Sequence, residues 1–156
     1  ADPAYLYQVM IDTAKEVGRD EDAAGLTANH NTVLAALPEL QPRAKTVLEL
    51  IDLAQFIYAV RPIKPDAAAA ALLTDDTRQV LKSIADTLGG LAEWSVPAID
   101  TAMRALAEEK GLKLGKLAQP LRAALTGRTV SPGIFEVMVL IGREESMARL
   151  GDQIAA

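Results

Sequence analysis

Residues 111–150 read GLKLGKLAQPLRAALTGRTVSPGIFEVMVLIGREESMARL, and they contain three short helical patterns that begin or end at glycines. The first pattern predicts a helix over residues 114–126, because Gly127 can adopt the left-handed conformation that ends a helix. The second is expected to begin at Ser131, a strong N-cap, with a proline at its first helical position, and to end at Gly142. The third follows directly, with two glutamates in its first turn, where acidic side chains suit the helix dipole.

A positive segment lies within this stretch of an otherwise acidic chain. The formal net charge of the whole sequence is −5. Residues 1–60 carry nine acidic and four basic side chains, whereas residues 101–156 carry six acidic and eight basic ones. Between residues 111 and 131 every charged side chain is basic, namely Lys113, Lys116, Arg122 and Arg128. A basic segment beside the start of a helix favours an anionic partner.

The composition favours an all-helical fold. Hydrophobic residues make up 50% of the chain and aromatic ones only 4%, which suits helices better than strands. There is no cysteine, and His30 is the only histidine, so disulfides, thiolate metal sites and paired-histidine metal motifs are excluded. No segment approaches the roughly 20 apolar residues that cross a bilayer. The first residues lack an initiator methionine and a signal-peptide hydrophobic region, which predicts an engineered or proteolytic boundary in a cytoplasmic protein.

Two prolines near the middle of the chain predict a boundary between two helical subdomains, residues 1–61 and 62–156. Pro62 and Pro65 cannot both lie inside one helix, and each favours extended backbone before it.

In the first subdomain we expect a helix that is capped by Asp2 and ends at Gly18, and then a solvated charged turn at residues 19–22. A second helix is predicted over residues 28–36, broken by Pro38, and a long third helix over residues 42–60.

In the second subdomain, before residue 111, the pattern predicts three further helices. They cover residues 66–73, a stretch from the Thr74 cap to Leu88, and residues 95–110.

No catalytic set can be assembled from the sequence. His30 lies in a polar Asn-His-Asn segment and is expected at the surface or at a helix start, away from any nucleophile. Adjacent acidic pairs, such as Asp75 with Asp76, are interpreted as helix caps and solvated faces. The Gly89-Gly90 pair is not followed by the lysine and hydroxyl of a phosphate-binding loop.

Two segments of the chain carry a family resemblance. KLGKLAQPLRAALTG at residues 113–127, followed by SPGIFEVMVLIGREESMARL at residues 131–150, resembles the C-terminal end of bacterial glutamyl-tRNA synthetases. PRAKTVLEL at residues 42–50 resembles, more weakly, another run of the same family's anticodon-binding region. The family's H-I-G-H-like and K-M-S-K-like catalytic motifs do not occur in this sequence.

The resemblance implies an all-α anticodon-binding domain of a class I aminoacyl-tRNA synthetase, formed by two small helical subdomains. It implies that the chain recognises the anticodon of tRNA(Glu), while an absent catalytic domain attaches glutamate to the tRNA. The chain alone is therefore expected to be inactive and to bind no cofactor, because ATP and Mg²⁺ belong to that catalytic domain. The expected partners are tRNA(Glu) and the catalytic domain, with no membrane or DNA, and the expected state is a monomer.

The resemblance also suggests binding residues. Unpaired bases stack on guanidinium planes and form hydrogen bonds along their edges, so Arg122 is expected to read a base. Arg43 is the matching candidate from the first subdomain, and Lys45 is expected to assist it. The alternative is that Arg122 only bonds a neighbouring carboxylate or helix end. Ser131, Pro132 and Ile134 would offer a hydroxyl, helix N-terminal amides and an apolar wedge. Lys113, Lys116 and Arg128 would neutralise phosphates without reading sequence.

Trp94 and Phe135 are expected in the core rather than as stacking platforms.

Two rival hypotheses remain for the whole chain. One is a helical protein–protein interaction module, in which wide apolar faces bind a partner, and the other is a stand-alone enzyme. Basic residues gathered on one face and strong salt dependence would distinguish RNA binding from both.

Overall fold

The computed structural model describes residues 2–156, which form ten α-helices, two 3-10 helices and no strand. The predicted all-α class is therefore confirmed. The chain divides into two compact units, the first reaching Ala59 and the second running from Val60 to Ala156, whereas the predicted boundary lay after residue 61. No helix within residues 2–156 combines the length and apolar character that a membrane crossing requires.

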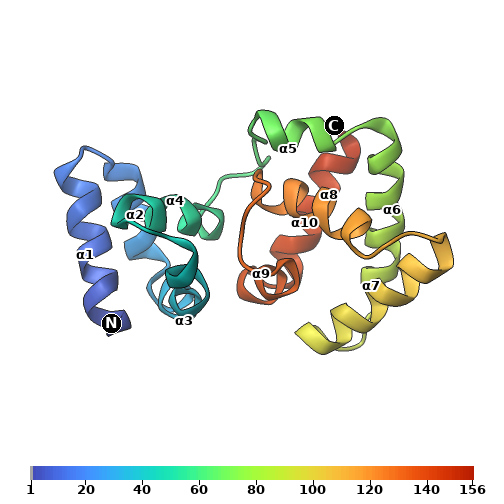
Figure 1. Cartoon of the computed structure of the whole chain (residues 1–156), viewed down its shortest axis with the longest axis horizontal. Helices are drawn as coiled ribbons and strands as arrows, with labels where there is room; N and C mark the ends of the chain where they lie inside the picture. Colours follow the sequence, from blue (N-terminus) through green and yellow to red (C-terminus); the bar gives the residue numbers. More distant parts are fainter. Residues whose placement is uncertain (1) are drawn as a thin grey trace. The chain divides into compact units, whose positions relative to one another are not determined.

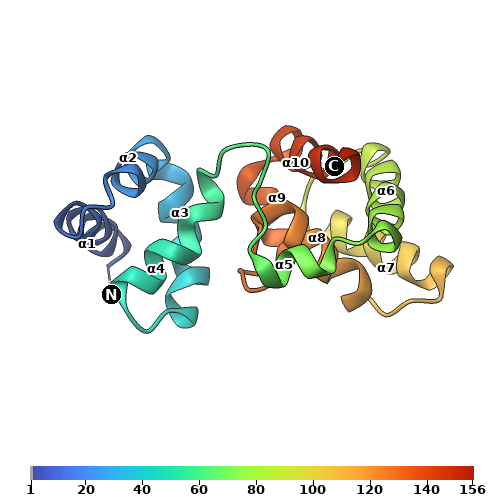
Figure 2. The same ribbon diagram turned by 90° about the horizontal axis from the view of Figure 1, so that it is seen from above.

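In the first unit, α1 packs against the other three α-helices (Figures 1 and 2). Its N-cap is Asp2, whose carboxylate accepts a hydrogen bond of 3.1 Å from the amide of Ala4. The core includes Met10, Leu26 and Leu37, which are fully buried. The helices are α1 (Pro3–Glu16), α2 (Asp20–Ala28), α3 (His30–Leu40) and α4 (Val47–Ala54), with 3-10 helices at Gln41–Arg43 and Gln55–Ile57.

Three expectations for this unit are wrong. The charged run after Gly18 is not a turn, because Asp20 begins α2 with three acidic residues in its first turn, where the helix dipole favours them. Helix α3 continues through Pro38 to Leu40, because Leu37 and Leu40 are fully buried and their packing outweighs one lost backbone hydrogen bond. The long third helix is shorter, since only Val47–Ala54 is α-helical and Thr46 caps it.

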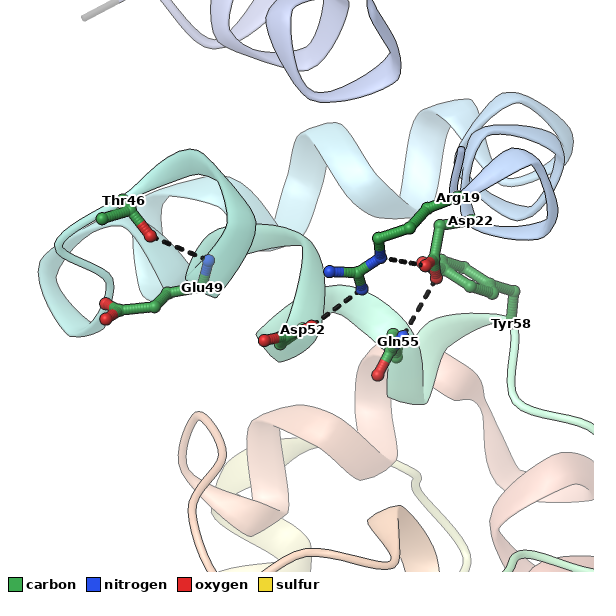
Figure 3. A network of polar contacts seen from close by, with 7 residues as sticks. All are labelled: Arg19, Asp22, Thr46, Glu49, Asp52, Gln55 and Tyr58. Atoms are coloured by element: carbon green, nitrogen blue, oxygen red, sulfur yellow. Dashed lines mark hydrogen bonds and ion pairs between the residues drawn. The ribbon is translucent and has the colours of Figure 1, made fainter. Parts of the chain in front are cut away.

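A polar network joins α2 to the end of the first unit (Figure 3). Asp22 accepts hydrogen bonds from Arg19 at 2.7 Å, Gln55 at 3.1 Å and Tyr58 at 2.6 Å. Arg19 also donates to Asp52 of α4 at 2.7 Å. Burial raises the pKa of Asp22, but the hydrogen bonds from Tyr58, Arg19 and Gln55 outweigh it, so this pKa lies below its usual value. Asp22 is therefore held as a carboxylate that fixes Tyr58 against α2.

In the second unit, α10 packs against α6, α8 and α9 (Figure 1). Thr74 caps α6 as predicted, and its side chain accepts a hydrogen bond from the first turn of that helix. Asp66 and Ser95, which were predicted as the first residues of their helices, cap α5 and α7 in the same way. The helices are α5 (Ala67–Leu72), α6 (Asp75–Gly89), α7 (Val96–Lys110), α8 (Gly115–Thr126), α9 (Ile134–Ile141) and α10 (Arg143–Ala155).

One face of α10 carries three buried polar side chains, each of which donates to a backbone carbonyl of a different segment. Ser146 donates to Met138 in α9 at 3.2 Å, Arg149 to Leu125 in α8 at 2.9 Å, and Gln153 to Ile63 at 2.9 Å. Their spacing of three and four residues places them on one side of the helix. We refer to Ser146, Arg149 and Gln153 as the donor stripe. It joins both helices that flank residues 127–133 to the segment that leads into α5.

Gly127 ends α8 as predicted, in the left-handed conformation with φ of 73°. Its carbonyl accepts a hydrogen bond of 2.9 Å from the amide of Asp66. A Cβ at this position would lie 2.8 Å from the carbonyl oxygen of Lys64. Glycine is required here both for its backbone conformation and for the close approach of the segment before α5.

We expect Asp22→Asn to destabilise the first unit by about 1–3 kcal/mol at pH 6, because it weakens three partly buried hydrogen bonds. An unfolded aspartate has a pKa of about 3.9. Since the folded pKa is lower, the wild-type contribution is complete above this value and is lost as the pH falls through the folded pKa. Amide hydrogen exchange in α1–α4 at pH 6 and pH 3 would measure this. A mutant deficit that stays the same at both pH values would contradict the assignment.

We expect Gly127→Ala to lower the unfolding free energy more than Gly111→Ala. Both glycines end a helix with positive φ, 73° and 66° respectively, so both substitutions carry a strain of about 1–2 kcal/mol. Only Gly127 is crowded, because an added Cβ at Gly111 meets nothing within 4 Å. Urea unfolding of the two variants, followed by the fluorescence of Trp94, isolates the cost of that contact. Equal losses would show that the approach of Lys64 is unimportant.

Candidate nucleic-acid interface

Arg122 lies on α8 and is held in place by two polar neighbours. Its Nε donates to the hydroxyl of Ser131 at 2.9 Å, and Nη1 lies 3.3 Å from the side-chain oxygen of Gln119. The side chain is half-buried. The structure thus brings together Arg122 and Ser131, which the sequence had placed in two consecutive helices. A guanidinium, a hydroxyl and a carboxamide meet at one place, and we call this trio the Arg122 cluster.

Gln119 was missed by the sequence reasoning as a member of this site. The signal was available, because residues three apart on a helix are neighbours and Gln119 precedes Arg122 by three. The contact with Ser131, nine residues away, could not be found in this way, because it depends on the path of the loop after Gly127.

Residues 127–133 form the loop between α8 and α9, and its first part is fixed by hydrogen bonds. The hydroxyl of Thr126 donates to the carbonyl of Arg122 at 2.8 Å and accepts from the amide of Arg128 at 3.1 Å. Within this loop the side chain of Val130 is 64% exposed. The loop therefore leaves α8 in a defined direction and presents a basic and an apolar side chain to solvent.

Ser131 is not the N-cap of the following helix, which corrects the sequence prediction. Helix α9 begins at Ile134 with Gly133 before it, and Gly133 makes no side-chain cap. The hydroxyl of Ser131 instead accepts from Arg122 and donates to the carbonyl of Pro132 at 2.6 Å. A long-range partner has replaced the local capping bond.

Pro132 and Ile134 are both buried, and Ile134 is only 4% exposed. This burial leaves little apolar surface for the wedge that was expected to face an RNA base. The two side chains support the loop from within the second unit.

Lys113 and Lys116 are exposed at the start of α8, and Arg128 is exposed in the loop. Helix α8 begins at Gly115, ahead of Pro120, and continues through that proline. The helix predicted over residues 114–126 is therefore confirmed, apart from its first residue. Because the helix is continuous, Lys116, Gln119 and Arg122 follow one another at steps of three and lie along one side of α8. Cations at one end of this side and the Arg122 cluster at the other suit a charged, polar ligand.

Arg43 and Lys45 belong to the first unit. Arg43 lies in the 3-10 helix after α3, and its guanidinium contacts Glu39 through the backbone carbonyl and, at 3.8 Å, through the carboxylate. The amide of Lys45 donates to the carboxylate of Glu49 at 2.7 Å. Both side chains are exposed. Arg43 and Lys45 form a second group of basic side chains, which is separate from the Arg122 cluster.

Trp94 and Phe135 are half-buried rather than fully buried. The indole Nε1 of Trp94 donates to the carbonyl of Met138 at 3.0 Å, and the guanidinium of Arg143 lies 5.1 Å from the ring centroid. Trp94 thus joins the start of α7 to the end of α9, which agrees with a packing role. Among residues 2–156, no group of three or more histidines, aspartates or glutamates is placed to hold a metal ion.

The sequence matches a family model described as anticodon binding domain over residues 6–154. Glutamate–tRNA ligase 1 of Brucella melitensis biotype 1 is 52% identical over 156 residues, which cover 99% of this chain and 33% of that protein. Glutamate–tRNA ligase 2 of Brucella ovis matches with the same identity and coverage. The chain therefore spans about a third of the length of these curated relatives.

Solved structures support the fold. A crystal structure of a glutamate tRNA ligase from Elizabethkingia meningosepticum matches with a TM-score of 0.72 and 23% identity, over 99% of this chain and 31% of that one. A glutamate-tRNA synthetase from Elizabethkingia anophelis matches with a TM-score of 0.67 and 22% identity, over 99% of this chain and 31% of that one. With a family model that matches nearly its whole length and relatives of this kind, the chain belongs to the anticodon-binding domain family and is similar to the matching third of glutamate–tRNA ligases.

Proposed function

We propose that this chain recognises the anticodon of tRNA(Glu) and serves as the anticodon-binding part of a glutamate–tRNA ligase. The observation that carries the proposal is the Arg122 cluster, in a chain that belongs to the anticodon-binding domain family. In the parent enzyme a catalytic domain would attach glutamate to the tRNA, using ATP and Mg²⁺. The chain would then act in the cytoplasm as a monomer, with that domain and tRNA(Glu) as its partners.

The Arg122 cluster has the chemistry that reading a single-stranded base requires. Bases in a loop are splayed out and are recognised by stacking and by hydrogen bonds along their edges. The planar guanidinium of Arg122 can stack on a base and donate parallel hydrogen bonds to it. Gln119 and Ser131, which already hold Arg122 at 3.3 and 2.9 Å, add a carboxamide and a hydroxyl. Because these contacts exist in the free chain, less side-chain freedom is lost when RNA binds.

Lys113, Lys116 and Arg128 would contribute affinity rather than specificity. Basic side chains at phosphates release counterions, and this sequence-independent effect makes RNA binding depend on salt. The net negative charge of the chain does not oppose binding of RNA at these residues, because most of the excess negative charge lies in residues 1–60. Val130, which is exposed, offers the apolar contact to a base or ribose that had been expected of the buried Ile134.

Arg43 and Lys45 would add a second RNA contact from the first unit. Both side chains are exposed. Arg43 donates to the backbone carbonyl of Glu39 and lies 3.8 Å from its carboxylate. This part of the proposal rests on the resemblance of residues 42–50 and on side-chain chemistry.

We expect Arg122→Ala to weaken binding of tRNA(Glu) and to reduce the preference for the cognate anticodon. One lost base contact corresponds to about 1–3 kcal/mol, or roughly a fivefold to hundredfold rise in Kd. Fluorescence anisotropy with tRNA(Glu) and with an anticodon-swapped tRNA would measure both effects.

The matched control for this experiment is Arg104→Ala, which removes an exposed arginine of α7 that pairs with Asp100 at 3.0 Å. This variant should keep the anticodon preference of the wild type. If Arg122→Ala and Arg104→Ala lower affinity equally for both tRNAs, Arg122 supplies only charge and does not read a base.

We expect the double substitution Lys113→Gln and Lys116→Gln to weaken binding of every tRNA by a similar factor. Each lost phosphate contact should reduce the slope of log K against log salt by about 0.7 for a single-stranded site. Titrations over a salt series would measure the slope, with the double substitution Lys15→Gln and Lys82→Gln, on exposed sides of α1 and α6, as a charge-matched control. An unchanged slope would exclude these two lysines from the RNA interface.

A further inference from the structure

Arg149 is the largest polar side chain in the core of the second unit, and it is 1% exposed. Its Nε donates to the carboxylate of Glu145 at 2.6 Å, one turn earlier on α10. Its Nη1 donates to the backbone carbonyl of Leu125 at 2.9 Å. Arg149 thus connects α10 to the last turn of α8, between Arg122 and the loop of residues 127–133.

The carbonyl of Leu125 is one of the last four in α8, and such carbonyls have no N–H partner within their own helix. A cation at this end of a helix also suits its dipole. Arg149 therefore acts as a side-chain cap that is supplied by a distant helix. The end of α8 cannot shift or unwind without breaking this buried, charge-assisted bond.

The same face of α10 also bonds to α9, the helix that follows the loop. Ser146, three residues before Arg149, donates to the carbonyl of Met138 near the end of α9 at 3.2 Å. The loop that contains Ser131 is therefore flanked by two helices whose final turns are both bonded to α10. The distance between Arg122 on α8 and Ser131 in the loop depends on how these two helices are held.

We propose that Arg149 is a positioning residue for anticodon reading: it fixes the end of α8 so that Arg122 and Ser131 meet before RNA arrives. This inference rests on the proposed function for its consequence in RNA binding, but the alignment it describes is a property of the free chain. Because the Arg149 side chain is only 1% exposed, it would act on RNA binding through the position of α8 and not by contacting the RNA.

Arginine is suited to this role in a way that other buried residues are not. A buried ion pair is a weak source of stability, and apolar replacements of a whole pair are often neutral. The planar fork of arginine, however, donates to a carboxylate and a carbonyl at the same time in a fixed geometry. Lysine keeps the charge but cannot reproduce both bonds along the same directions, so Arg149→Lys separates geometry from charge.

The test compares Arg149→Lys with wild type and with Arg78→Lys, using the full 156-residue chain. Arg78 is a matched control, because its Nε also donates to a backbone carbonyl, that of Gln153 at 3.1 Å, but it bonds neither α8 nor α9 there. The first readout is the NMR signal of the Arg122 Nε–H group in the free chain. We expect it to shift and to exchange faster with water in Arg149→Lys, and to stay unchanged in Arg78→Lys.

The second readout is the Kd for an anticodon-swapped tRNA divided by the Kd for tRNA(Glu), measured at a temperature where every variant is folded by circular dichroism. We expect Arg149→Lys to reduce this ratio about fivefold, as for one misplaced hydrogen bond, while the salt slope stays that of wild type. Arg78→Lys should keep both the Kd ratio and the salt slope of wild type. If Arg149→Lys does not fold, Glu145→Gln replaces it, with a smaller effect in the same direction expected.

The outcomes separate this inference from the proposed function. If wild type does not discriminate between the tRNAs, the proposed function fails, and the NMR signal alone decides the alignment. An unchanged Arg122 signal in Arg149→Lys and Glu145→Gln would overturn the positioning role. So would a changed signal that appears equally in Arg78→Lys, because the effect would then be general loosening of the unit.

Discussion

The second unit depends on one helix face that bonds to the backbone of its neighbours. The donor stripe of Ser146, Arg149 and Gln153 is buried, and each member satisfies a carbonyl of α9, α8 or the segment before α5. Buried polar groups are costly unless they are paired, so these bonds allow few alternative arrangements of the helices. At the end of α8, Gly127 adds a close approach to Lys64 and a bond to Asp66. As a result, the loop that carries Ser131 has a defined path, and Arg122 finds its partner in the absence of RNA.

Much of the fold could be predicted because helix ends carry local signals. Capping side chains at Asp2, Thr74 and Ser95, and a glycine at residue 127, act within one turn of the chain and are visible in the sequence. Predictions failed where tertiary contacts override local preference. Pro38 and Pro120 lie inside helices because the buried side chains around them outweigh one missing backbone bond each. Ser131 is a residue type that commonly caps helices, but its hydroxyl accepts a hydrogen bond from Arg122 instead. Helix α9 begins only at Ile134.

The candidate site was predictable in its residue types and less so in its geometry. Lys113, Lys116, Arg122 and Arg128 stand out because no acidic residue lies among them, and exposure of the two lysines and Arg128 suits contacts with phosphates. The position of Ile134 could not be foreseen, because its burial depends on how α9 packs. The Arg122 cluster offers a guanidinium, a carboxamide and a hydroxyl, which are groups that form hydrogen bonds to a base. Large exposed apolar side chains, on which the rival hypothesis of a protein-docking module depends, occur in both units, from Tyr5 in the first to Val139 in the second.

The most direct test of the account is to titrate the isotope-labelled chain with an RNA hairpin that carries the glutamate anticodon, and to follow backbone and arginine side-chain NMR signals. Anticodon reading by the Arg122 cluster predicts that the largest changes occur at Arg122 Nε, Gln119 and Ser131. It also predicts that these changes shrink when the anticodon bases are replaced while the stem is kept. Changes that ignore the anticodon, or that leave these three residues unaffected while other surfaces respond, would contradict the central claim that this cluster reads RNA.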